Sequence, residues 1–250
     1  MADRNLLTVR NLRVTFRQDG KDMPAVDGVS FEVAEGETVA LVGESGSGKS
    51  VTALSTVSLL GENATITGSI DYKGTQMVGA PEKDLMDVRG DDISFIFQEP
   101  LSALSPLQRI GQQLVEALRL HNDISKKEAW ALAAEWLEKV KIPDVNERMF
   151  AYPFQLSGGM QQRVMIAMAM MLEPDLIIAD EPTTALDVTI QSKIFALIKE
   201  MRLDKTSILL ITHDMGVIWE MCDRVVVMYA SRIAEEADRN DIFAKPAHPY

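Results

Sequence analysis

The chain has 250 residues, of which 46% are hydrophobic and 25% charged, so it can build a substantial core as one large domain or two small ones. Its formal net charge of −12 disfavours a protein that binds nucleic-acid backbone, which normally needs a basic face, although a local basic pocket remains possible. The single cysteine, Cys222, excludes an internal disulfide and a four-cysteine metal cluster.

No membrane segment is evident along the chain. The first twelve residues lack the apolar stretch of a signal peptide. The longest apolar run, residues 164–172, is too short to cross a bilayer, which takes about 20 residues. If the protein works at a membrane, we expect another chain to supply the spanning part.

The first 75 residues are rich in β-branched and apolar residues and predict mainly strands, with one helix that starts near Gly48. The expected strands cover residues 6–16, 29–33, 38–42 and 68–74.

The pattern then changes to helical spacing. Ile110, Leu114 and Leu118 recur every four residues, and residues 130–140 repeat in the same way. This spacing predicts a small all-helical insertion over residues 108–150.

From residue 158 onward, apolar strands alternate with helices. The expected strands there are residues 176–180, 207–212 and 224–229, each preceded by a helix, the first two at about 160–172 and 189–203. An earlier strand is expected at residues 93–98. Continuous apolar strands that alternate with helices indicate a parallel sheet covered on both faces, so the fold class is α/β.

A phosphate-binding loop follows the predicted strand at 38–42. GESGSGKS, residues 43–50, has the pattern G-x-x-x-x-G-K-S and precedes a helical stretch. Its backbone N–H groups would converge on phosphate oxygens, Lys49 would meet the β- and γ-phosphates, and the Ser50 hydroxyl suits Mg²⁺. The expected ATP-binding residues are Gly43, Glu44, Ser45, Gly46, Ser47, Gly48, Lys49, Ser50 and Val51. The alternative is a glycine-rich turn without a ligand.

Two carboxylates end the buried strand at 176–180. In α/β sheets, ligands bind at the carboxyl ends of strands. Asp180 is predicted to hold Mg²⁺, and Glu181 to act as the general base that polarises an attacking water. The alternative is an acid pair that caps a helix.

Gln98 and His213 also follow predicted strands. The Gln98 amide could reach Mg²⁺ or the attacking water, and the His213 imidazole could donate to the γ-phosphate and hold Glu181 and water in line. Both residues could instead satisfy nearby backbone groups.

With LSGGMQQ at 156–162, these segments resemble the ATP-binding cassette (ABC) transporter family over nearly the whole chain. The resemblance implies one P-loop ATPase cassette over 1–250. Its core, with an antiparallel β-subdomain, would cover residues 1–100 and 155–250, and a helical subdomain residues 101–154. It also implies that Phe16 stacks on adenine, although Phe16 could be plain strand core. The signature residues would reach ATP held by a facing subunit, and Asp187 would line that dimer seam. The signature residues are Ser157, Gly158, Gly159 and Gln161.

Several segments resemble the peptide/nickel branch of bacterial importers, among them FQEPLSALSP and DEPTTALDVTIQ. This resemblance implies an ATPase for peptide uptake that uses ATP and Mg²⁺. Its expected partners are two transmembrane permease subunits, a second cassette (identical or paralogous) and, indirectly, an extracytoplasmic solute-binding protein, with no nucleic acid. Its expected place is the cytoplasmic face of the bacterial inner membrane, as a peripheral subunit.

Three other interpretations of the same resemblance stay open. One is nickel or glutathione uptake, and a second is a non-transport ATPase of repair or translation. A binding-only cassette is the third. Relatives continue past the HPY segment at residues 248–250, so the expectation is part of a longer chain or one half of a tandem ATPase.

Overall fold

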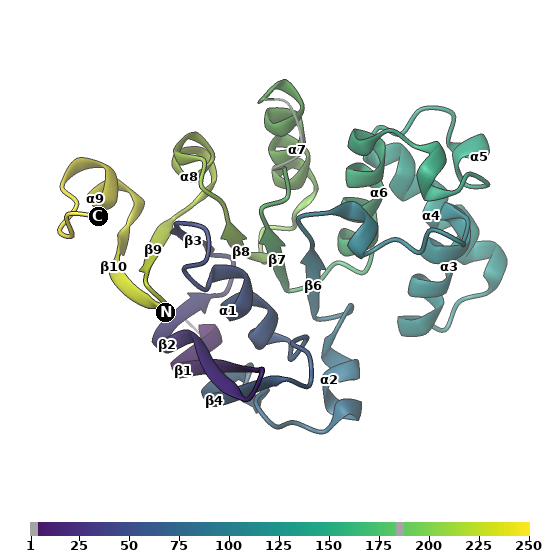
Figure 1. The fold of residues 1–250 in the computed structure, drawn as a ribbon. Helices are drawn as coiled ribbons and strands as arrows, with labels where there is room; N and C mark the ends of the chain where they lie inside the picture. Colours follow the sequence, from purple (N-terminus) through teal and green to yellow (C-terminus); the bar gives the residue numbers. More distant parts are fainter. Residues whose placement is uncertain (1–4, 184–187) are drawn as a thin grey trace. The chain divides into compact units, whose positions relative to one another are not determined.

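The computed structural model describes residues 5–183 and 188–250, and the chain divides into two compact units. We call residues 1–89 together with 204–250 unit 1, and residues 90–203 unit 2. Figure 1 labels most of the helices and strands. The division of one cassette into a core and a subdomain over 101–154 stays a prediction.

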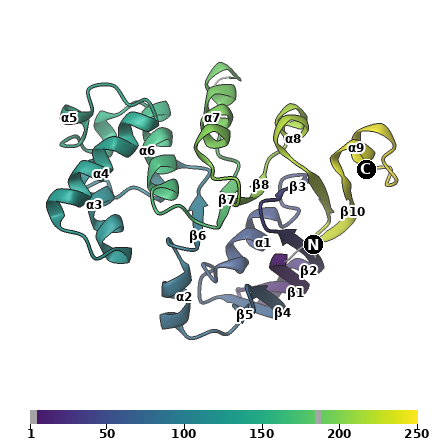
Figure 2. The same cartoon turned by 180° about the vertical axis from the view of Figure 1, so that it is seen from behind.

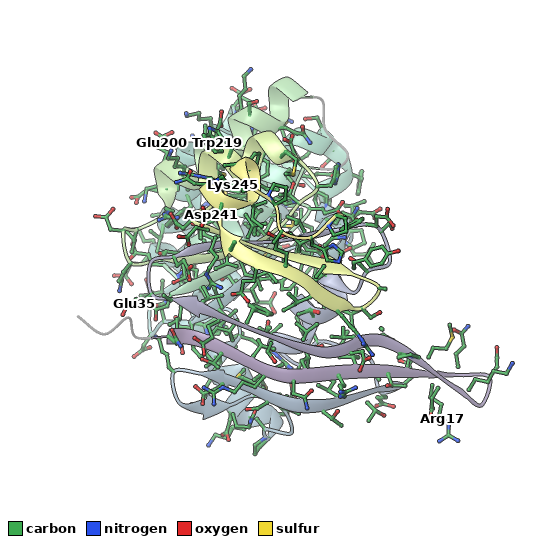
Figure 3. The ribbon with its side chains drawn as sticks, turned by 90° about the vertical axis from the view of Figure 1, so that its left-hand side faces the viewer. Arg17, Glu35, Glu200, Trp219, Asp241 and Lys245 are labelled. Carbon is green, nitrogen blue, oxygen red and sulfur yellow. The ribbon has the colours of Figure 1, made fainter. Side chains whose placement is uncertain are left out.

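Unit 1 contains a four-stranded antiparallel sheet in the order β2-β1-β4-β5. Its strands are β1 (Asn5–Gln18), β2 (Lys21–Ala34), β4 (Ala64–Tyr72) and β5 (Thr75–Gln76). Alternate apolar residues of β1, among them Leu12 and Val14, are fully buried, which explains why this segment forms one side of a sheet. The β1–β2 ribbon is longer than the sequence predicted, and Figure 3 shows Arg17 near its far end. The pairing of β4 with β5 is visible in Figure 2.

Unit 1 also carries a second set of strands, built around the mostly buried strand β3. β3 pairs in parallel with β8 on one side and with β9 on the other, and β10 pairs with β9 in the antiparallel sense. The strands are β3 (Thr38–Gly43), β8 (Ser207–Ile211), β9 (Arg224–Tyr229) and β10 (Arg232–Asp238). The helices of this unit are α1 (Lys49–Thr56), α2 (Glu82–Val88), α8 (Met215–Met221) and α9 (Arg239–Ala244). The sequence predicted neither β10 nor α9.

Unit 2 contains a parallel pair of strands and most of the helices. The strands are β6 (Ile93–Ile96) and β7 (Leu176–Asp180). The α-helices are α3 (Ile110–His121), α4 (Lys126–Lys139), α5 (Val145–Arg148), α6 (Gly158–Met170) and α7 (Val188–Met201). Two short 3₁₀ turns are η1 (Pro100–Ser102) and η2 (Pro153–Gln155). The strand predicted to end at Gln98 ends at Ile96, so Gln98 lies in the loop that follows.

The helical spacing predicted for residues 108–150 is confirmed. Ile110, Leu114 and Leu118 of α3 are fully buried, as are Ala133 and Leu137 of α4. These two helices pack side by side (Figures 1 and 2). Within the described part of the chain, no helix is both long and apolar enough to cross a membrane.

Candidate nucleotide site

The phosphate loop joins β3 to α1 within unit 1. Gly46 has a φ of 80° and Gly48 a φ of 99°, a left-handed conformation that glycine adopts without penalty. A side chain would meet no atom within 4 Å at Gly46, whereas at Gly48 it would lie 2.5 Å from the main-chain oxygen of Ala25. The loop is therefore open where Gly46 lies and closely packed where α1 begins.

Lys49 turns back over this loop. Its Nζ donates hydrogen bonds of 2.8 Å to the main-chain oxygens of both Gly43 and Glu44, and the side chain is only 6% exposed. Beside it, the Ser47 hydroxyl is buried and has no hydrogen-bond partner among the described residues. A buried ammonium group, an unsatisfied hydroxyl and an open main-chain turn at a helix N-terminus fit the phosphate groups of a nucleotide.

His213 belongs to the same unit as the phosphate loop. Leu41 of β3 pairs with Ile211 of the parallel strand β8. Gly43 lies two residues after Leu41, and His213 lies two residues after Ile211. The parallel strands β3 and β8 therefore place the phosphate loop and His213 at the same edge of the sheet. His213 is exposed, and the Asp214 carboxylate next to it caps α8 by accepting from the N–H groups of Gly216 and Val217.

Unit 2 repeats this arrangement with its own parallel pair. Ile96 of β6 pairs with Ala179 of β7, and the residues two positions further along are Gln98 and Glu181. Their side chains meet, with 3.5 Å between Gln98 Nε2 and Glu181 Oε2. This distance is at the outer limit of a hydrogen bond, so the contact aligns the two groups only weakly. Glu181 has a φ of 43°, which is uncommon for a residue with a side chain.

The residues predicted to hold Mg²⁺ come from both units. Ser50 lies at the start of α1 in unit 1, whereas the buried Asp180 and the exposed Gln98 lie in unit 2. Their hydroxyl, carboxylate and amide oxygens are ligand types that Mg²⁺ accepts beside phosphate oxygens. No group of three or more His, Cys, Asp or Glu residues that could hold a metal ion was found over residues 5–183 and 188–250.

The signature residues lie at the N-terminus of α6 in unit 2. Ser157 is the N-cap and accepts from the N–H of Met160 at 3.4 Å. Ser157 and Gly158 are both exposed, and a side chain at Gly158 would meet nothing within 4 Å. Gln161 instead folds back, since its amide donates to the main-chain oxygens of Pro153 and Leu156. The exposed start of α6 therefore has the geometry of an anion site, while Gln161 holds the loop that leads to it.

Two further predictions have different outcomes in the structure. Phe16 of β1 is half-buried, with neighbours Met23 of β2 and Ala64 of β4, so its ring is not enclosed in the strand core. Asp187 lies outside the described residues. The sequence interpretation missed Gln162, which is buried beside the end of β7; its position one turn into the α6 pattern was the only signal.

Comparisons with known proteins agree with this fold and place the chain in a family. The profile of the family described as "ABC transporter" matches residues 26–184. The oligopeptide transport ATP-binding protein OppD of Salmonella typhimurium is 48% identical over 98% of this chain and 73% of its own length. The dipeptide transport ATP-binding protein DppD of Bacillus subtilis is 51% identical over 98% of this chain and 74% of its own length. A solved dimeric ATP-binding cassette in a post-hydrolysis state, bound to ADP and Pi, superposes with a TM-score of 0.83. It is 28% identical, and the match covers 93% of this chain and 98% of that one.

The phosphate loop, the acidic strand end and the fold together define a nucleotide-hydrolysing cassette of the P-loop class. The chain belongs to the ABC transporter family, as an ATP-binding cassette ATPase.

Proposed function

We propose that this chain is the ATP-hydrolysing subunit of a bacterial importer and that it energises the uptake of peptides through a pair of membrane partners. The observation that carries the proposal is the match over 98% of the chain to relatives named as oligopeptide and dipeptide transport ATP-binding proteins. The site supplies the chemistry that such a subunit needs.

ATP binding begins in the phosphate loop. The main-chain N–H groups of residues 43–51 and the N-terminus of α1 receive the phosphates, and Phe16 stacks on the adenine. In the described structure Lys49 donates to two loop carbonyls at 2.8 Å. A triphosphate would offer this ammonium group a charged acceptor in their place, so binding replaces neutral hydrogen bonds by stronger charge-assisted ones.

Hydrolysis is the attack of a water on the γ-phosphorus, which breaks its bond to the β–γ bridging oxygen. Glu181 accepts the proton of this water, Gln98 helps to orient it, and His213 donates to a γ-phosphate oxygen. Ser50, Asp180 and Gln98 would hold Mg²⁺, which would supply positive charge beside the phosphate oxygens. The 3.5 Å contact between Gln98 and Glu181 supports a shared role for these two side chains at the water.

The signature loop serves the nucleotide of a second cassette. Ser157, Gly158 and Gly159 present a hydroxyl and main-chain N–H groups at the start of α6, and this surface is open. Two cassettes facing head to tail would then hold two ATP molecules between them, and Asp187 would line the seam. Hydrolysis removes the γ-phosphates and releases the pair, which gives a switch able to drive a membrane partner.

The helical segment 101–154 offers a surface for the membrane partner. A groove of about 750 Å³ lies over α3, α4 and the turn after α5. Trp130 and Phe150 lie in contact within it, with ring centroids 5.2 Å apart. Its charged lining residues are Arg109, Glu116, Arg119 and Lys126, so the rim is basic on balance. Leu120, also at the groove, is 70% exposed. An apolar floor with a basic rim fits an amphipathic segment that carries acidic residues.

The first experiment is purification of the tagged protein from native membranes, followed by mass spectrometry of whatever remains bound. We expect two multi-span membrane proteins and a cassette subunit, and labelled dipeptide uptake that stops when the chain is deleted. Uptake of nickel or glutathione without uptake of dipeptide would show that the transported substrate is nickel or glutathione. Co-purification with RNA or DNA that resists moderate salt would favour a non-transport ATPase.

If the protein emerges alone, the Glu181→Gln variant decides the case. It should bind ATP, dimerise in its presence and show almost no turnover, because only the proton acceptor is lost. The matched control is Lys49→Ala, which should bind ATP roughly 10- to 100-fold more weakly and should not dimerise at ATP concentrations that saturate Glu181→Gln. Normal turnover in Glu181→Gln would exclude Glu181 as the base.

A further inference from the structure

One buried glutamine connects the signature helix to the strand that carries the catalytic carboxylates. Gln162 lies one turn into α6 and is 2% exposed. Its Nε2 donates a hydrogen bond to the main-chain oxygen of Pro182, the residue that follows Glu181. Both partners belong to unit 2, and the bond is buried. A buried amide that donates to a main-chain carbonyl fixes the position of that peptide.

The next residue is held from another helix. Gln191 of α7 donates through its Nε2 to the main-chain oxygen of Thr183 at 3.3 Å and to the Thr183 hydroxyl at 3.1 Å. The chain that leaves β7 is therefore held at two consecutive residues by amides from α6 and α7. Neither glutamine was among the residues predicted to form the site.

Glu181 itself needs such support. Its φ of 43° lies in the left-handed region, which a residue with a side chain seldom occupies. Such strained conformations persist only where several surrounding contacts hold the main chain in place, and they are most frequent at functional sites. The hydrogen bond from Gln162 holds the peptide between Pro182 and Thr183, one residue beyond Glu181, so it fixes the main chain that follows Glu181.

We propose that Gln162 is a positioning residue for Glu181 and that it joins the signature helix to the catalytic strand end of the same chain. This inference rests on the proposed function, in which Glu181 accepts the proton of the attacking water. Gln162 touches neither water nor nucleotide in this account. The helix that carries it begins at Ser157, so a shift of the signature loop would reach Glu181 through this bond.

The test is Gln162→Met, which keeps the length and burial of the side chain but removes the donor. We expect kcat for ATP hydrolysis to fall roughly 10- to 100-fold, because Glu181 is displaced without being lost. The KM for ATP and the ATP-dependent dimerisation should change by less than about twofold, since the phosphate loop and the exposed start of α6 are untouched. The double variant Gln162→Met with Glu181→Gln should hydrolyse ATP no more slowly than Glu181→Gln alone.

The matched control is Gln113→Met in the same unit. Gln113 is 6% exposed and donates to the main-chain oxygens of Ser105 and Gln108, away from β7. It should lose stability without a comparable fall in kcat. If Gln162→Met does not fold, Gln191→Met tests the same segment from a half-buried position and should lower kcat in the same direction.

Three results would overturn the proposal. They are unchanged kcat in both glutamine variants, a kcat loss in Gln113→Met as large as in Gln162→Met, and loss of ATP-dependent dimerisation in Gln162→Met. The last would make Gln162 a part of the signature surface alone. Absence of ATP turnover in the wild-type protein would instead contradict the proposed function. Failure of the proposed function can therefore be distinguished from failure of the role proposed for Gln162.

Discussion

The main-chain oxygen of Ala25 lies 2.5 Å from the point where a side chain would begin at Gly48, while the same point at Gly46 has no atom within 4 Å. Both glycines have positive φ values, 99° and 80°. Glycine is therefore required at these two positions of the loop for different reasons. At Gly46 the reason is backbone conformation, and at Gly48 crowding against β2 is added to it.

Gly48→Ala should destabilise the nucleotide-free protein more than Gly46→Ala does. A methyl group at residue 46 meets only the conformational penalty, of about 1 kcal/mol, because the space is open. At residue 48 the loop or β2 must also move, so we expect a loss of roughly 2–4 kcal/mol. Urea unfolding of both variants in the absence of ATP measures the difference, and equal losses would contradict the crowding argument.

Lys49→Met should weaken ATP binding roughly 10- to 100-fold, which is the effect of one lost hydrogen bond from a charged group. The variant also leaves the main-chain oxygens of Gly43 and Glu44 without the ammonium group that they share at 2.8 Å. Titration with a fluorescent ATP analogue gives the affinity. Lys199→Met, at an exposed position of α7, is the control and should bind as the wild type does. Unchanged affinity in Lys49→Met would show that the lysine does not reach the phosphates.

Much of this fold follows from local sequence patterns. The buried strands β3, β7 and β8 each contain four consecutive apolar residues, and the phosphate loop has fixed residue spacing, so each can be recognised from the local sequence alone. β10 was missed because Arg232–Asp238 is mostly polar, and as an edge strand it needs no apolar run. Its Glu235 instead holds the tail, accepting from the N–H groups of Ala247 and His248 at 2.8 Å.

The sequence names candidate residues for the site but not how they are arranged. Asp180 and Glu181 stand out because two carboxylates end an apolar run. The left-handed conformation of Glu181 has no sequence signal, since nothing local to glutamate favours it. The bond from Gln162 to Pro182 joins residues 20 positions apart, and only packing brings them together.

The single cysteine gives a prediction about pH. Cys222 is fully buried, and this burial, with a contribution from the charge of Asp223, raises the pKa of its thiol from 9.0 to about 12. In the unfolded chain the thiol ionises near pH 9, whereas in the folded chain it stays protonated. The folded-state pKa is raised, so this stabilising contribution is complete below pH 9 and is lost as the pH rises toward 12.

Wild-type protein should therefore lose stability between pH 9 and pH 11 more steeply than Cys222→Ala, in which other titrating groups are unchanged. Urea unfolding at several pH values measures this difference. At pH 8 the folded wild-type thiol should also resist a thiol reagent and react only after unfolding. Parallel pH curves for the two proteins would contradict the assigned pKa.

The proposed exchange of signature loops between cassettes makes a prediction for mixed dimers. Glu181→Gln removes the base from the site of its own chain, whereas Ser157→Arg blocks the signature loop that serves the facing site. Each variant alone should be almost inactive, because both of its sites carry a defect. In a dimer with one copy of each variant, both defects fall on the same site and the other site is intact.

Mixing the two inactive variants should therefore restore turnover, through the fraction of dimers that contain one copy of each. Steady-state ATP hydrolysis across mixing ratios measures this, and the activity should be highest near equal amounts. Glu181→Gln mixed with Lys49→Ala is the control: both defects lie in the acceptor half of the site, so each mixed dimer has two damaged sites. No restored activity in the Ser157→Arg mixture would mean that the signature loop acts on the nucleotide of its own chain. Restored activity in the control would mean that the recovered turnover does not come from an intact site in the mixed dimer.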